Sequence, residues 1–122
     1  MGQHIFIITG SIFGLLAILL GAFGAHALKK ILSEEQLKSF ETGVKYQMYH
    51  AIVLLTLGLN SEYSTSAMYW CFSIGILFFS FSIYGLVLSS AKGKKIRLLG
   101  AITPIGGLLL AAGWLLIVLK AF

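Results

Sequence analysis

Side chains that can exchange protons or bind polar groups gather next to two apolar runs in the first half of the chain. His26 ends the first run, and Tyr46, Gln47 and His50 directly precede residues 51–59. Because histidine changes charge near neutral pH, such a group can relay a proton, bind a lipid headgroup or line a pore entrance. The same side chains can also hold helices together by hydrogen bonds within the membrane. We predict that all four form one polar cluster on the cytoplasmic side, and we favour the structural role.

Other chemistry has little support in this sequence. There is no aspartate, no glycine-rich phosphate loop and no serine-centred nucleophile motif. Cys71 is the only cysteine, and His4 lies near the opposite membrane face from His26 and His50, so no metal site is expected. We therefore predict a protein that is not an enzyme, with no catalytic residues, no cofactor and no metal.

The composition indicates that the bilayer is the solvent of this chain. Its 122 residues are 58% hydrophobic and 11% charged, whereas soluble domains are about 25% charged. The mean hydropathy is +0.95. The net charge of +5 comes from basic residues beside apolar runs, which favours anionic lipid headgroups as partners over nucleic acid.

The apolar runs predict an all-α membrane protein of one domain, residues 1–122. Four spans are expected, at about residues 5–26, 41–59, 67–90 and 98–119, because about 20 helical residues cross the hydrocarbon core. The second apolar run is short. Ser33 and Gln36 form a capping-box pattern, and no proline follows before Leu59, so one helix of about 39 Å can include it. The expected fold is a four-helix transmembrane bundle in which an amphipathic cytoplasmic-side helix, residues 33–45, leads into the second span.

One face of this amphipathic segment carries alternating charges. The spacing of four residues from glutamate to lysine occurs twice and favours ion pairs within the helix. We interpret it as an interfacial charge ladder at the level of the headgroups. Its members are Glu34, Lys38, Glu41 and Lys45.

The distribution of basic residues predicts the topology. Two segments hold eight of them, and the opposite side has only Lys120, so by the positive-inside rule both segments are cytoplasmic and both termini outside. We expect a multi-pass protein of a bacterial plasma membrane. The first span is expected to be retained and not cleaved as a signal peptide. The basic residues are Lys29, Lys30, Lys38 and Lys45 in the first segment and Lys92, Lys94, Lys95 and Arg97 in the second.

Small residues predict close helix packing. In the first span Gly10, Gly14, Ala17, Gly21 and Gly24 recur every three or four residues, a spacing that lets helix backbones approach in lipid. In the fourth span Pro104 should kink or loosen the helix. Beside it, Gly106 and Gly107 are expected to serve packing.

Three motifs resemble one known family. Residues 21–28 read GAFGAHAL, residues 40–51 read FETGVKYQMYHA, and residues 103–107 read TPIGG, followed by Gly113 and Trp114. The chain resembles, over nearly its whole length, the YgdD family, also called domain of unknown function 423, to which the eukaryotic transmembrane protein 256 is related. The resemblance implies a small membrane protein with four helices and no established activity. It matches the family at His26, Tyr46, Gln47, His50 and Pro104 without supplying a role for any of them.

Two functions remain open from the sequence. The first is a non-enzymatic protein that supports membrane or envelope integrity, or a partner complex, by binding lipid or protein. The alternative is an oligomeric channel or proton-linked small-solute transporter that uses His26 and His50, with a homo-oligomer formed through the glycine seams. A hydrated cavity at His50 favours transport, and a dry hydrogen-bonded cluster favours the structural role.

Overall fold

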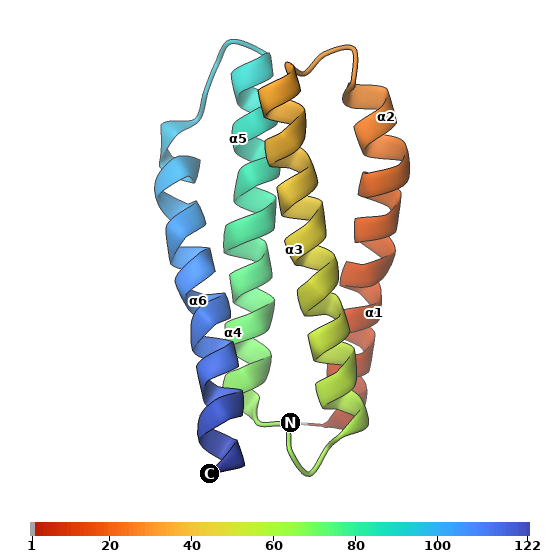
Figure 1. Ribbon diagram of the computed structural model, residues 1–122, viewed down its shortest axis with the longest axis vertical. Helices are drawn as coiled ribbons and strands as arrows, with labels where there is room; N and C mark the ends of the chain where they lie inside the picture. Colours follow the sequence, from red (N-terminus) through yellow and green to blue (C-terminus); the bar gives the residue numbers. More distant parts are fainter. Residues whose placement is uncertain (1) are drawn as a thin grey trace.

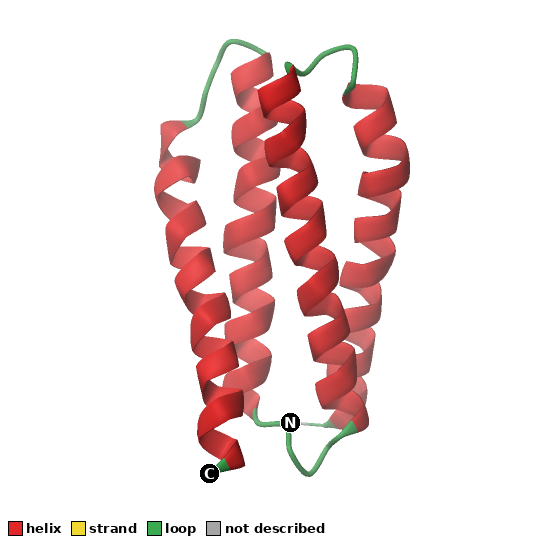
Figure 2. Ribbon diagram, viewed as in Figure 1, coloured by secondary structure: helices red, strands yellow, loops and turns green. Residues whose placement is uncertain are grey.

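The computed structural model describes residues 2–122, in which every regular element is helical (Figures 1 and 2). Two short π-helical segments, η1 and η2, join α-helices end to end, so the chain forms four long helices. Three of these, Gln3–Leu28, Ser66–Ala91 and Arg97–Ala121, are long and apolar enough to cross a membrane. The elements are α1 (Gln3–Leu19), η1 (Leu20–Gly24), α2 (Ala25–Leu28), α3 (Glu34–Leu59), α4 (Ser66–Ile76), η2 (Leu77–Phe81), α5 (Ser82–Ala91) and α6 (Arg97–Ala121).

The start of α3 follows from its first residues. The Ser33 hydroxyl accepts a hydrogen bond from the backbone N–H of Gln36 at 3.1 Å, and the Gln36 side chain accepts one from the N–H of Ser33 at 2.9 Å. This capping box satisfies two N–H groups that otherwise lack partners. The helix runs unbroken for 26 residues to Leu59, as the sequence predicts. Segment 33–45 therefore contains the N-cap and the first half of α3.

Ser33→Ala should lower the free energy of unfolding by about 1 kcal/mol, because the N-terminal N–H groups of α3 lose their acceptor. Ser39→Ala is the matched control, since Ser39 is exposed within the same helix. Equilibrium unfolding in mixed micelles measures both variants. Equal stabilities would show that the capping box contributes nothing.

The four long helices pack in a fixed order. The α1 helix packs on α3, α3 packs on the helix formed by α4, η2 and α5, and α6 also packs on that helix. The loop at residues 29–33 and the loop at residues 92–96 share one end of the molecule, here called the basic end (Figure 1). Both termini lie at the other end, the terminal end (Figure 1). The two central helices therefore hold most of the buried residues.

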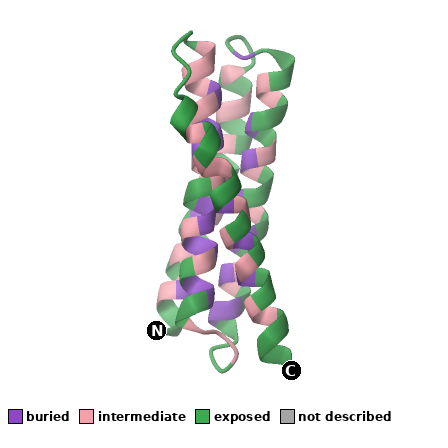
Figure 3. Ribbon diagram, turned by 90° about the vertical axis from the view of Figure 1, so that its left-hand side faces the viewer, coloured by how far each residue is buried: buried purple, intermediate pink, exposed green. Residues whose placement is uncertain are grey.

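The outer surface is apolar along most of its length. Large side chains point away from the core on the outer helices, including Phe23, which is 69% exposed, and Leu108, which is 72% exposed. Exposed residues follow the outside of the helices from end to end (Figure 3). Such a surface is costly in water but is the normal outer face of a protein in lipid.

The small residues of the first helix face α3. A Cβ added at Gly10 would lie 2.8 Å from the Ala51 carbonyl oxygen, and Ala17 is 1% exposed. Gly14, Gly21 and Gly24 follow on the same side, where their nearest neighbours are Ala51, Val44 and Phe40 respectively. These close contacts fix the position of α3 along the first long helix.

Pro104 does not end the fourth long helix. The α6 helix continues through it from Arg97 to Ala121. Gly106 lies against the backbone of η2, and Gly107 against the Phe79 ring. The Thr103 hydroxyl donates to the Leu99 carbonyl, so the turn before Pro104 gains a side-chain hydrogen bond.

Candidate functional site

Gln47 is the centre of a buried polar cluster between three of the long helices. Its side chain is fully buried. The Nε2 group donates to the Phe13 carbonyl of α1 at 2.8 Å, and the Tyr84 hydroxyl of α5 donates to Oε1 at 2.7 Å. One turn away, the Ser80 hydroxyl donates to the Gly43 carbonyl at 2.7 Å. We call Gln47, Tyr84 and Ser80 the central clamp, because their bonds hold α1, α3 and the η2–α5 segment together.

His50 makes a second link, from α3 to α6. It is 5% exposed, and the Trp114 indole N–H donates to its Nε2 at 3.0 Å. Its Nδ1 lies 2.7 Å from the Tyr46 carbonyl oxygen, which can only accept. A ring whose Nε2 accepts and whose Nδ1 donates is the neutral tautomer with its proton on Nδ1. Both nitrogens of His50 are therefore already used within the protein.

The predicted four-residue cluster is only partly formed. Gln47 and His50 lie on the inner side of α3, and Tyr46 stacks against Phe79 with ring centroids 5.0 Å apart while staying 39% exposed. His26 is exposed in α2, at the basic end. Glu34 begins α3 at the same end, and Gln47 follows it by 13 residues, about 20 Å along the helix. His26 is therefore the member of the predicted cluster that lies apart.

Gln47 lies deeper in the bundle than His26 does. Gln47 bonds Phe13 and Tyr84, so it lies near the middle of the bundle and not toward its basic end. The first turns of α3 pack beside α2 and α5 at the basic end, and Gln47 follows more than three turns later.

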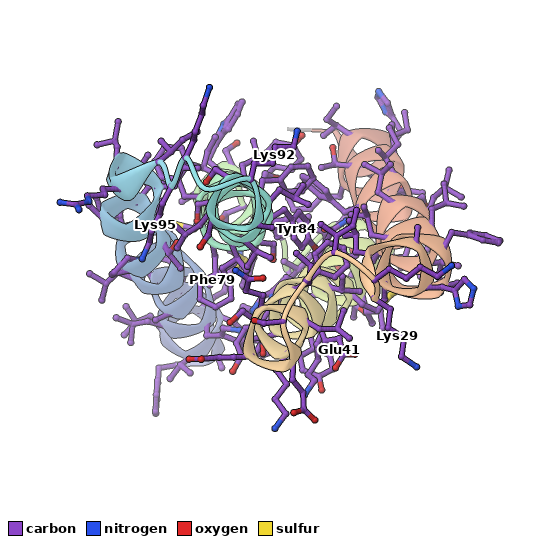
Figure 4. All side chains as sticks on the ribbon, turned by 90° about the horizontal axis from the view of Figure 1, so that it is seen from above. Lys29, Glu41, Phe79, Tyr84, Lys92 and Lys95 are labelled. Carbon is purple, nitrogen blue, oxygen red and sulfur yellow. The ribbon has the colours of Figure 1, made fainter. Side chains whose placement is uncertain are left out.

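All four residues of the predicted charge ladder are exposed on the outside of α3: Glu34, Lys38, Glu41 and Lys45. Figure 4 shows Glu41 on the outer side of this helix, away from the interior position of Tyr84.

Sequence reasoning missed the partners of these residues. Tyr84 and Trp114 lie in apolar runs, where the sequence does not show which polar residue each one meets. A buried tyrosine or tryptophan usually needs a partner for its O–H or N–H group. That requirement was a usable signal, but it does not say which of several polar residues the partner is.

An apolar groove runs between α3 and α6 from His50 toward the terminal end. It consists of two adjoining hollows of about 600 and 370 Å³, which share Ile52, Val53 and Trp114. The inner hollow contains the exposed edges of Tyr46 and Tyr49. Among residues 2–122 there is no group of three or more His, Cys, Asp or Glu side chains close enough to hold a metal ion. The groove therefore offers shape and apolar surface but few polar groups.

Comparison with known proteins gives a consistent family and no activity. The family model described as "Protein of unknown function (DUF423)" matches residues 20–107. The UPF0382 membrane protein SH2409 of Staphylococcus haemolyticus is 41% identical over 98% of this chain and 97% of its own length. The UPF0382 membrane protein YwdK of Bacillus subtilis is 40% identical over 98% of this chain and 97% of its own. No solved structure matches.

Proposed function

The chain belongs to the DUF423 family of membrane proteins, and because that family names no activity, we propose a function from the geometry. We propose a non-enzymatic protein that binds anionic lipids at its basic end and so supports membrane integrity. In this proposal α3 makes a fourth crossing, the basic end is cytoplasmic, and both termini are outside. The protein acts as a compact lipid-binding bundle.

The observation that carries the proposal is the set of cations around the basic end. Six basic side chains of the two loops and their flanks are exposed there, opposed by Glu34 and Glu35 at the start of α3. Figure 4 looks down on this end, with Lys29 on one side and Lys92 and Lys95 on the other. Each lysine or arginine near an anionic membrane surface contributes about 1 kcal/mol of attraction. The six are Lys29, Lys30, Lys92, Lys94, Lys95 and Arg97.

The interior supports a structural role for the buried polar groups. Within the described residues, Ser73 Oγ is the one buried side-chain oxygen or nitrogen without a hydrogen-bond partner. Each polar side-chain atom of Gln47 and His50 has a hydrogen-bond partner within the protein, as expected for helix–helix contacts in a membrane. The alternative of a proton-linked channel needs a hydrated path at His50. Its paired nitrogens, and the distance to His26 along the bundle, give that alternative less support.

The triple variant Lys92→Gln/Lys94→Gln/Lys95→Gln should lose the stabilisation that anionic lipid gives the native protein. The measurement is the thermal unfolding midpoint in nanodiscs of phosphatidylcholine with and without phosphatidylglycerol. We expect phosphatidylglycerol to raise the unfolding midpoint of the native protein. At low salt the three lysines together should contribute about 3 kcal/mol of attraction to the anionic lipid. Native mass spectrometry should find less phosphatidylglycerol retained by the variant.

Lys120→Gln at the terminal end is the control and should respond to phosphatidylglycerol like the native protein. An equal response of the triple variant and the native protein would contradict lipid binding by the loop at residues 92–96. The cellular test is deletion of the gene, followed by permeability and membrane-potential measurements under membrane stress. Unchanged values would contradict the role in membrane integrity.

A further inference from the structure

The apolar groove between α3 and α6 continues toward the basic end. A third hollow, of about 350 Å³, lies between the same two helices, nearer that end than the inner hollow of about 600 Å³. Thr42 and Pro104 line the third hollow, and about one helical turn after each of them Tyr46 and Gly107 line the inner hollow. The two hollows therefore follow each other along one groove.

The groove is open on its outer side, because α3 and α6 both pack on a third helix. Each of them contacts the helix formed by α4, η2 and α5, which supplies the floor through Phe79 and Ile83. Figure 4 looks down from the basic end and shows Phe79 between α6 and α3. Two side chains of the rim are about half exposed, Tyr49 at 53% and Trp114 at 46%. In a membrane this open side faces lipid chains.

The groove is polar at the basic end and apolar deeper in the bundle. The third hollow contains the hydroxyl groups of Ser39, Thr42 and Thr103. Arg97 is exposed at the start of α6, one turn before Gly100 and on the same face. A Cβ added at Gly100 would meet nothing within 4 Å, so the way from Arg97 into the third hollow is open. Arginine is well suited to bind a phosphate group, because its guanidinium can donate two parallel hydrogen bonds.

The charges around this mouth favour an anion. Arg97 of α6 and Lys38 of α3 are exposed, and Lys95 lies two residues before Arg97. Glu35, one turn before Ser39, is the carboxylate on the same face of α3. Three cations therefore stand against one carboxylate at the polar end of the groove.

The length of the groove fits one leaflet. Ala111, which lines the inner hollow, follows Gly100 by 11 residues, about 17 Å of helix. That is close to half of a hydrocarbon core of about 30 Å. An acyl chain that enters beside Arg97 therefore ends at the deep end of the inner hollow, beside Trp114.

We propose that this groove holds one anionic phospholipid from the leaflet at the basic end. Its phosphate lies at Arg97, and one of its acyl chains lies along Phe79 and Gly107 toward Trp114. This site rests on the lipid-binding function proposed above and gives that function a place in the fold. The loop lysines attract the anionic surface as a whole, whereas the groove retains a single molecule.

Filling the groove tests the acyl-chain site without changing any charge. Ala111→Phe places a ring in the inner hollow, and Ala101→Phe places the same ring on the outer face of α6. Both alanines are exposed, and Ala101 lines none of the three hollows. Native mass spectrometry of protein released from mixed phosphatidylcholine and phosphatidylglycerol nanodiscs should show that Ala111→Phe loses the retained phosphatidylglycerol molecule and Ala101→Phe keeps it. Arg97→Gln should weaken this retention about fivefold.

The outcomes separate this site from the broader function. A native protein that neither retains phosphatidylglycerol nor is stabilised by it would overturn both. If the native protein retains it and the triple lysine variant does not, but Ala111→Phe retains as much as Ala101→Phe, lipid binding stands and the groove site is overturned. Circular dichroism confirms that each variant is helical.

Quenching of Trp114 fluorescence tests the same site without a substitution in the groove. The chain has two tryptophans, so Trp70→Phe leaves Trp114 as the one fluorophore of this kind. Two nanodisc samples of identical composition carry bromine on the acyl chains of either the phosphatidylglycerol or an equal amount of the phosphatidylcholine. A phosphatidylglycerol chain in the groove predicts stronger quenching by the label on phosphatidylglycerol. Equal quenching in the two samples would overturn the site, including in the case where a neutral lipid or a protein segment fills the groove.

Discussion

Gly106→Ala should lower the free energy of unfolding by about 3 kcal/mol, because the added methyl group meets backbone and not a movable side chain. A Cβ at this position would lie 2.5 Å from the Phe78 carbonyl carbon and 2.8 Å from the Phe79 Cα. Neither atom can move without shifting η2 away from α6. Unfolding in mixed micelles measures the loss.

Gly100→Ala is the matched control in the same helix. A Cβ there would meet nothing within 4 Å. Alanine has the higher helix propensity by up to about 1 kcal/mol, so this variant should be as stable as the native protein or slightly more so. Equal stabilities of the two alanine variants would contradict the close contact of α6 with η2.

The π-helical segment explains why Gly106 is so restricted. A single wider turn at Leu77–Phe81 changes the path of its helix where α6 crosses it. The single proton of the Ser82 hydroxyl is shared between the carbonyls of Phe78 and Phe79, and the Ser82 oxygen can accept from the Thr103 hydroxyl of α6. Side-chain hydrogen bonds thus satisfy backbone groups that the wider turn leaves poorly paired.

Local patterns in the sequence predict the helices well. Ser33 and Gln36 define the start of α3, and the absence of proline extends it to Leu59, as observed. Apolar run length identifies the three long apolar helices. These features depend only on residues close in sequence, so they can be read without knowing what each helix packs against.

The candidate site depends on the relative depth of the helices, which the sequence does not contain. The contacts of Gly10 and Gly24 with α3 determine which residues meet Gln47. If α3 lay two turns closer to the basic end, Gln47 would lie closer to His26. The sequence likewise contains no signal for η1 or η2, because π-helical turns have no simple residue pattern. For these reasons the polar residues of α3 could be singled out, but their partners Tyr84 and Trp114 could not.

Gln47→Leu should destabilise the protein by about 2–3 kcal/mol, because it leaves the buried Tyr84 hydroxyl without its acceptor. Tyr84→Phe should cost less, about 1 kcal/mol, since the Gln47 amide keeps its bond to the Phe13 carbonyl. If the two side chains act as one clamp, the double variant costs less than the sum of the single variants. A coupling of about 1 kcal/mol is expected for a hydrogen bond between membrane helices.

This double-mutant cycle also separates the two interpretations of the cluster. A clamp predicts a loss of stability in each variant and a measurable coupling between them. A ligand site held ready for a proton or solute predicts the opposite, because removing polar groups that lack firm partners stabilises a buried site. Additive effects of the two substitutions on stability, or a gain in stability for Gln47→Leu, would therefore contradict the clamp. Either result would favour the alternative that the central residues bind a transported species.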